Sequence, residues 1–213
     1  FVKNKIIKYL NLYEDASALI IFRILFGLQM TVSLTRFWYK GWIESIYINP
    51  LFHFKYYGFE WVSSLGTYTY FLFFTCLISA VMITIGYKYK FSTIIFFLSF
   101  TYMELIDKTT YLNHYYFISL ISFILIFLPA NCRFSIDSSK KGISFIKIPK
   151  WNIDIIKLMI VIVYFYAGIA KINSDWLIEA MPLALWLPQK YDLPIIGSII
   201  SQKWVAYLMS WCG

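Results

Sequence analysis

The chain alternates between long apolar segments and short polar ones, and the apolar segments are long enough to be transmembrane helices. A hydrocarbon layer about 30 Å thick requires roughly 20 apolar residues in a helix that rises 1.5 Å per residue. By this measure we expect five spans, at residues 16–35, 61–87, 91–106, 109–132 and 151–170. The predicted fold class is therefore all-α, a polytopic transmembrane helix bundle.

The residues after the fifth expected span have a different pattern. Three prolines, Pro182, Pro188 and Pro194, interrupt an apolar stretch there, which predicts interfacial or re-entrant pieces. A sixth span is expected to start near Trp204. We find no repeat or soluble domain, so residues 1–213 are predicted to form a single transmembrane domain, incomplete at its C-terminus.

Basic residues gather in alternate connections between the expected spans. They lie in the N-terminal segment, in the turn at Lys88 and Lys90, and in the stretch 131–150. Cytoplasmic loops of membrane proteins are enriched in Lys and Arg, so we expect the N-terminus of this multi-pass protein to be cytoplasmic. Five residues are then predicted to lie near the extracytoplasmic ends of their helices: Asp107, Lys108, Asn113, His114 and Lys171.

Composition supports the membrane assignment and narrows the function classes. The chain is 60% hydrophobic and only 14% charged, whereas soluble domains carry about 25% charged residues. Its net charge of +8 follows from the basic loops, so nucleic acid is not an expected partner and membrane lipid is. The three cysteines show no CxxC spacing, and no metal site is predicted. Phosphate-loop, nucleophile-elbow and zinc signatures are absent from the sequence.

Charged residues inside spans are costly and usually face a cavity, a bundle interior or one another. Arg23 is expected to tie helices together through Glu104, its natural candidate partner, or through backbone carbonyls. His114 lies at a span end, where a histidine is more often a hydrogen-bonded or interfacial residue than a ligand or base. Asp107 and Lys108 are weaker candidates, since a structural ion pair at a helix junction explains them equally well.

Lys171 ends the apolar run 160–170, and two interpretations are open. A lysine at this position can extend its ammonium group to the lipid headgroups. Alternatively, the spacing of Tyr164, Gly168 and Lys171 puts them on one helix face, where glycine permits close approach of a ligand. A desolvated lysine in such a pocket can act as a base.

Four sequence blocks, in this order along the chain, resemble a known family. They are FRILFGLQM at 22–30, IDKTTYLNHYYFISL at 106–120, FLPANCRFSID at 127–137 and VYFYAGIAKINSDW at 163–176. The sequence is similar to the vitamin K-dependent gamma-glutamyl carboxylases and to bacterial proteins that share their HTTM (horizontally transferred transmembrane) domain. The resemblance covers nearly the whole chain.

This resemblance implies an enzyme that uses vitamin K hydroquinone or menaquinol, with dioxygen and carbon dioxide as co-substrates, to carboxylate glutamate in a protein or peptide while forming an epoxide. It also implies that Lys171 is the base that deprotonates the hydroquinone. Asn113 and His114 are implied to lie at the same site, where they orient the cofactor or stabilise its oxyanion. Tyr164, Gly168 and Trp176 are weaker cofactor-binding candidates, for which packing is the favoured interpretation.

The chain departs from the family pattern in two places. Ala170 stands where animal carboxylases have the first of two consecutive lysines, so only Lys171 is retained. The sequence also ends near LMSWCG, before the further spans and the extracytoplasmic region of those enzymes. Two alternatives are therefore kept open: quinol oxidation or epoxidation without carboxylation, and a non-catalytic subunit or scaffold that binds other membrane subunits.

Overall fold

The computed structural model describes residues 2–142, 146–190, 192, 194 and 196–212. The chain divides into two compact units, unit 1 at Phe1–Ile156 and unit 2 at Lys157–Gly213. Residues 143–145, in the middle of the expected basic loop 131–150, lie outside the described residues. Each unit is described by itself.

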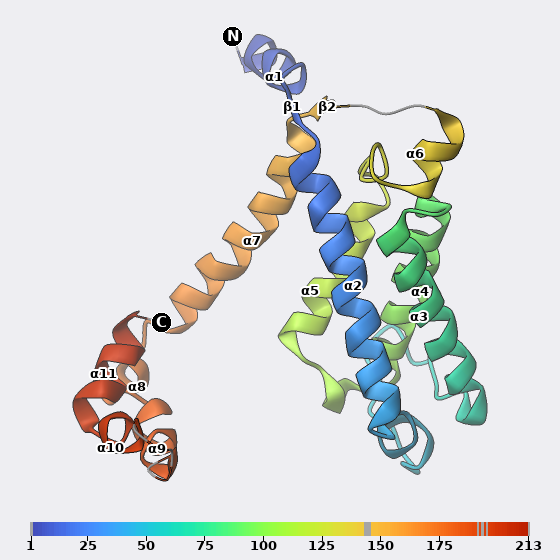
Figure 1. Ribbon diagram of the computed structural model, residues 1–213. Coiled ribbons are helices and arrows are strands. Elements are labelled where there is room, and N and C mark those ends of the chain that lie inside the picture. Colours follow the sequence, from blue (N-terminus) through green and yellow to red (C-terminus); the bar gives the residue numbers. More distant parts are fainter. Residues whose placement is uncertain (1, 143–145, 191, 193, 195, 213) are drawn as a thin grey trace. The chain divides into compact units, whose positions relative to one another are not determined.

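Unit 1 is built on four consecutive helices that pack side by side (Figure 1). They are α2 (Ser17–Tyr39), α3 (Thr69–Ile85), α4 (Tyr89–Ile106) and α5 (Asn113–Leu125). Each helix packs on the next one in sequence, so neighbouring helices are antiparallel. Because α3 lies between them in this order, α2 and α4 run in the same direction.

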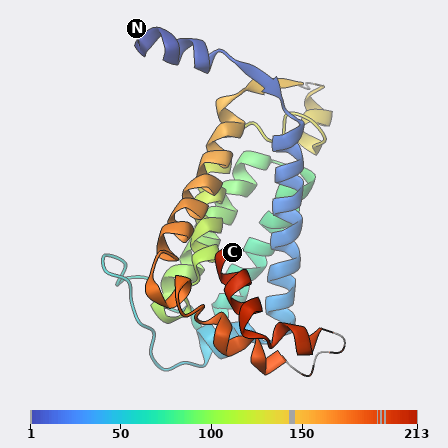
Figure 2. The same cartoon turned by 90° about the vertical axis from the view of Figure 1, so that its left-hand side faces the viewer.

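Short elements close the two ends of this helical body. At one end, β1 (Tyr13–Asp15) pairs antiparallel with β2 (Lys147–Pro149), and α6 (Ile136–Lys141) lies nearby. The other end carries three short helices: η1 (Glu44–Ile48), η2 (Gly66–Tyr68) and η3 (Lys108–Thr110). Figure 2 shows the long loop between η1 and η2 at the end away from β1 and β2. Helix α1 (Val2–Leu10) precedes β1.

A small residue lets α2 and α3 approach closely. A Cβ atom added at Gly27 would lie 2.4 Å from Thr84 Oγ1 and 2.9 Å from the Ala80 carbonyl oxygen. No larger side chain fits at this point without moving one of the two helices. Beside Gly27 on α2, the Phe26 ring meets the Phe96 ring edge to face with centroids 5.6 Å apart, which joins α2 to α4.

The end with β1 and β2 is held by two charged side chains. Arg23 is fully buried and donates hydrogen bonds to the Ile83 carbonyl at 3.1 Å and the Phe134 carbonyl at 2.6 Å. Asp137 accepts from the backbone N–H groups of Lys88 and Tyr89, which begin α4. A carboxylate is favourable there because the first amides of a helix have no partner within the helix. Arg23 therefore joins α2 to the end of α3 and to the stretch 131–150, and Asp137 joins that stretch to the start of α4.

Three helices among the described residues are long and apolar enough to cross a membrane: Ser17–Tyr39, Gly66–Ile85 and Trp151–Ala170. They correspond to the first, second and fifth expected spans, and the last, α7 (Trp151–Ala170), has the expected bounds. The count of five stays a prediction. Helix α4 carries Lys90 and Glu104 near its two ends, and α5, with 13 residues, is about 20 Å long.

The expected continuous span 109–132 was wrong in its detail. Its first residues form η3, α5 begins at Asn113, and after Leu125 the backbone continues in tight turns through Leu128. Pro129 lacks the N–H group that would continue the helical hydrogen bonding.

Unit 2 contains most of α7 followed by α8 (Ser174–Leu177), α9 (Leu183–Trp186), η4 (Pro188–Lys190), α10 (Gly197–Ile200) and α11 (Lys203–Cys212). Trp176 Nε1 donates to the Ser210 carbonyl at 2.6 Å, and Trp211 Nε1 donates to the Leu177 carbonyl at 2.9 Å. These bonds attach α11 to α8. Short helices are present after Lys171, and α11 begins at Lys203, near the expected start of a sixth span, which stays a prediction.

Candidate functional site

A pocket of about 430 Å³ lies within unit 1, at the end away from β1 and β2. Its walls come from the second half of α2, the last turns of α4, the beginning of α5 and the segment around η1. Pockets that bind small molecules typically enclose 300–1,000 Å³ and are mostly apolar with a few polar groups. This pocket meets both conditions.

Aromatic rings form most of one wall. Phe37 stacks on Phe73 with centroids 5.2 Å apart and meets Trp42 edge to face at 5.3 Å. Tyr47 packs against the same Phe73 ring at 5.6 Å, and Phe100 meets Tyr115 edge to face at 6.0 Å. These contacts fix the rings, so the pocket presents a firm apolar surface to a flat ligand.

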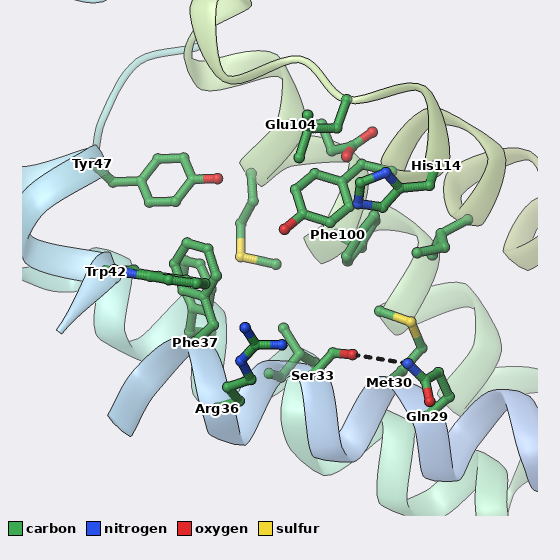
Figure 3. A pocket seen from close by; sticks show the side chains of 16 residues that line it. Gln29, Met30, Ser33, Arg36, Phe37, Trp42, Tyr47, Phe100, Glu104 and His114 are labelled. Carbon is green, nitrogen blue, oxygen red and sulfur yellow. Dashed lines mark hydrogen bonds between the residues drawn. The ribbon is translucent and has the colours of Figure 1, made fainter. Parts of the chain in front are cut away.

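Four polar side chains from four different elements converge on the cavity (Figure 3). The Arg36 guanidinium comes from α2, the Tyr47 hydroxyl from η1, the Glu104 carboxylate from α4 and the His114 imidazole from α5. Glu104 Oε2 accepts a hydrogen bond from the Ser119 hydroxyl at 3.2 Å, which links α4 to α5. The pocket therefore combines a cation, a carboxylate and two further hydrogen-bonding groups.

Arg36 is in the last turn of α2, where a cation is favoured by the partial negative charge of the helix C-terminus. Its guanidinium carbon lies 5.7 Å from the centre of the Trp42 ring. Within the described residues of unit 1, no carboxylate oxygen lies within 4.0 Å of the guanidinium group. Its positive charge is thus available to a ligand in the pocket.

The Tyr47 hydroxyl stays protonated at neutral pH. The side chain is 6% exposed, and this burial raises the pKa of Tyr47, with further contributions from the neighbouring Tyr115 and Glu104. A neutral phenol can donate its O–H to an oxygen atom in the pocket. Tyr47 therefore adds a donor to the part of the pocket that it lines.

Asp107 and His53 hold the chain beside the pocket. Asp107 is 5% exposed and accepts hydrogen bonds from the Thr109 backbone and hydroxyl groups, both at 2.8 Å. His53 Nδ1 lies 3.1 Å from Asp107 Oδ2. Burial alone would raise the pKa of Asp107, but the bonds from Thr109 and His53 outweigh it and lower the pKa.

The contacts of Asp107 account for its place in the sequence. It ends α4, caps η3 and fixes the entry to α5, which carries Asn113 and His114 in its first turn. The ion pair between Asp107 and Lys108 that was expected at this helix junction does not form, and the side chain beside the Asp107 carboxylate is the His53 ring. Lys108 is exposed, and its backbone N–H donates to the Phe54 carbonyl at 2.8 Å.

The sequence candidates fall into both units. Asn113 and His114 belong to unit 1, where His114 lines the pocket; Asn113 is exposed and outside the pocket lining. Tyr164, Gly168, Lys171 and Trp176 belong to unit 2. The expectation that Lys171 and His114 share one site stays a prediction.

Within unit 2, Lys171 follows the end of α7, and its backbone N–H donates to the Gly168 carbonyl at 3.1 Å. Its Nζ atom lies 5.0 Å from the centre of the Trp176 ring. Trp176 is itself fixed by its bond to Ser210, so its position has a structural cause. Tyr164 is 74% exposed, and a Cβ atom at Gly168 would meet no described atom within 4 Å.

Glu104 was the wrong partner for Arg23. Arg23 bonds to the carbonyls of Ile83 and Phe134, whereas Glu104 accepts from Ser119. Because α2 and α4 run in the same direction, two of their side chains can pair only if they lie at a similar height along the helix axes. Arg23 is six residues from the start of α2 and Glu104 fifteen from the start of α4, a difference of about 14 Å along the axes. The alternative expectation, that Arg23 binds backbone carbonyls, is confirmed.

Sequence reasoning missed Arg36 and Tyr47. Both lie within the connection 36–60, which was expected at the same end of the protein as Asp107 and His114. The backbone hydrogen bond between Lys108 and Phe54 confirms that this connection meets the turn after α4. This shared location was the available signal. It did not indicate which side chains of the connection face inward.

Comparison with known proteins gives one family. A family model of the HTTM domain matches residues 11–213. The match includes both units and every candidate residue named above. No solved structure is significantly similar to the chain.

Proposed function

The chain belongs to the HTTM domain family, and from that premise we propose that it is a membrane enzyme that binds a hydroquinone in the pocket of unit 1. The family is the one found in vitamin K-dependent carboxylase and related proteins. The proposed activity is carboxylase-like: oxidation of the hydroquinone by dioxygen, coupled to carboxylation of glutamate in a protein or peptide. The single observation that carries the proposal is that His114, the histidine of the resembling block, lines the aromatic pocket.

The residues of the pocket fit a hydroquinone head group. A flat apolar ring matches the walls formed by Phe37, Phe73 and Phe100, and the volume of about 430 Å³ is in the range of cofactor pockets. The hydroxyl groups of the ligand need partners that accept and donate hydrogen bonds. Glu104 and His114 can accept, while Arg36 and Tyr47 can donate.

When bound, a hydroquinone would supply two ionisable hydroxyl groups and a pair of reducing electrons. The side chains of the chain would orient the ring, hold its oxygen atoms and keep water from it. In this proposal His114 orients one hydroxyl group, and Lys171, on the strength of the resemblance, takes its proton. The amine of Lys171 must be neutral to do so, which desolvation favours.

The test uses the purified protein in lipid nanodiscs with reduced vitamin K or menaquinol, dioxygen, a glutamate peptide and labelled bicarbonate. We expect epoxide and labelled peptide, both reduced at least a hundredfold by Lys171→Ala and by His114→Ala. Lys190→Ala is the matched control, because Lys190 is an exposed lysine of unit 2. It is expected to leave turnover unchanged.

Each contrary result identifies an alternative. Epoxide without label would select quinol epoxidation without carboxylation. Neither product, together with a stable complex with other membrane proteins that survives Lys171→Ala, would select the scaffold. Equal turnover by the wild type and Lys171→Ala would remove Lys171 from the role of base.

A further inference from the structure

The pocket has a cation on one wall and an ionisable carboxyl group on another. Arg36 reaches it from α2 and Glu104 from α4, and the two side chains point into the same cavity (Figure 3). No ion pair within 4.0 Å joins them in the described structure. An oxygen atom of a ligand therefore meets a different electrostatic environment at each wall.

From this arrangement we infer that Arg36 is an oxyanion-binding residue, which holds the deprotonated oxygen of a phenolic ligand in the pocket. The inference rests on the proposed function, because a hydroquinone is such a ligand, and it extends to phenols and naphthols generally. Arg36 is the positioning partner of the oxygen and takes no proton from it.

The geometry gives Arg36 this property rather than a purely structural one. A structural arginine would be paired, as Arg23 is with two carbonyls. The side chain of Arg36 has the Trp42 ring as its neighbour, at 5.7 Å, and leaves its N–H groups directed at the cavity. A guanidinium presents several donors in a plane, which suits an oxygen that carries negative charge.

Other titratable groups line the same pocket and affect its preference for the phenolate over the phenol. The Glu104 carboxyl group opposes a negative ligand when it is ionised, and Tyr47 supports the ligand as a neutral donor. His114 and Tyr115 on α5 complete the set. Burial of the phenolate away from water strengthens the effect of each charge. The affinity for the anion should therefore respond in opposite directions to the loss of Arg36 and the loss of Glu104.

The equilibrium involved is a single deprotonation. The O–H bond of the phenol breaks, the electron pair stays on oxygen, and the proton passes to the buffer. Binding that favours the phenolate over the phenol lowers the pH at which the bound ligand ionises. A tenfold preference corresponds to one pH unit.

The experiment titrates 4-nitrophenol bound to the full chain in nanodiscs and follows the visible absorbance of its phenolate. This signal lies apart from the ultraviolet absorbance of the 18 tyrosines and 8 tryptophans. We expect the bound probe to ionise at a lower pH than the free probe. Arg36→Gln is expected to weaken phenolate binding about tenfold or more, since hydrogen bonds to charged groups are strong, and Arg36→Lys should retain part of the effect.

Two further variants make the result specific. Lys40→Gln removes a neighbouring cation whose Nζ lies 4.8 Å from the Trp42 ring but which does not line the pocket, so it should leave the ionisation midpoint within about 0.3 unit of the wild type. Glu104→Gln should move the midpoint further down. This opposite shift keeps the inference testable if Arg36→Gln does not fold.

The inference is overturned if the bound probe ionises at the same pH in the wild type and Arg36→Gln, if Lys40→Gln has the same effect as Arg36→Gln, or if the wild type binds neither 4-nitrophenol nor its methyl ether. The outcome is separate from the turnover assay. A protein without hydroquinone turnover can still show the phenolate preference, and an active enzyme can lack it.

Discussion

His53 Nδ1 lies 3.1 Å from Asp107 Oδ2. The two residues are 54 positions apart in the sequence. This contact attaches the loop between η1 and η2 to the end of α4. The Lys108 to Phe54 backbone hydrogen bond reinforces it. Since Asp107 also fixes the turn that leads to His114, the loop and the pocket share one anchor.

Asp107→Asn is expected to destabilise the protein by about 2 kcal/mol at pH 7, because the side chain is buried and accepts bonds from Thr109 and His53. The folded-state pKa of Asp107 is below its unfolded value. The contribution of the carboxylate is therefore fully present above the unfolded pKa of about 3.9 and is lost as the pH falls through the folded pKa.

The measurement is thermal unfolding of the wild type and Asp107→Asn in the same lipid, from pH 7 down to the lowest pH at which both fold reversibly. The difference in stability should be constant above about pH 5 and should shrink below it. A difference that does not depend on pH in the acid range would show that the charge of Asp107 contributes nothing.

Gly86 combines two constraints that a matched variant can separate. Its φ of +64° is in the left-handed region, as is the φ of +67° at Gly41. A Cβ atom at Gly86 would also lie 2.1 Å from an Arg23 nitrogen and 2.3 Å from Ser135 Cβ, whereas Gly41 has no atom within 4 Å. Substitution by alanine costs about 1–2 kcal/mol for the backbone at either position.

We therefore expect Gly41→Ala to lower stability by this backbone cost and Gly86→Ala to lower it by clearly more. The excess measures the displacement of the buried Arg23 from its two carbonyl partners. Thermal unfolding of both variants gives the comparison directly. Equal losses would mean that Arg23 moves aside at no cost.

Gly27 and Gly168 both lie within helices, but only Gly27 has atoms close to the position of an added Cβ. Gly27→Ala should weaken the packing of α2 on α3, because its Cβ would lie 2.7 Å from the Thr84 backbone nitrogen. Gly168→Ala meets no described atom and should be neutral or stabilising by up to about 1 kcal/mol from helix propensity. Unfolding temperatures of the two variants test this.

Gly168 also has a functional test. If the open face at Gly168 serves a ligand, as its spacing with Tyr164 and Lys171 predicts, Gly168→Ala should reduce hydroquinone turnover without loss of stability. Unchanged turnover would leave this glycine without a role in the site.

Part of the helical pattern was readable from the sequence, because a long apolar segment depends on local composition alone. The bounds of α7 were predicted, and the segment 36–60 does meet the turn at Asp107 and Lys108. The sequence did not decide between the two expected partners of Arg23, because the choice depends on the relative depth of two helices. Whether Arg36 faces the pocket depends on the rotation of α2 about its axis, which apolar residues on all sides of the helix leave undefined. Whether Tyr47 faces the pocket depends in the same way on the orientation of η1.

Trp176 offers the last prediction, since it separates a packing role from a site role in unit 2. Its indole N–H donates to the Ser210 carbonyl, and the Ser210 hydroxyl donates to the Trp176 carbonyl at 2.5 Å. Trp176→Phe keeps an aromatic ring but leaves the Ser210 carbonyl without this donor, at a cost of about 1–3 kcal/mol.

Hydrogen exchange of α11 should accelerate about tenfold or more in Trp176→Phe. Trp186→Phe, at a tryptophan that is 58% exposed, is the control and should leave α11 unchanged. Because the same ring lies 5.0 Å from Lys171 Nζ, the Phe variant retains an aromatic face for the lysine. A loss of turnover without faster exchange would assign Trp176 to the site, and faster exchange with full turnover would assign it to packing.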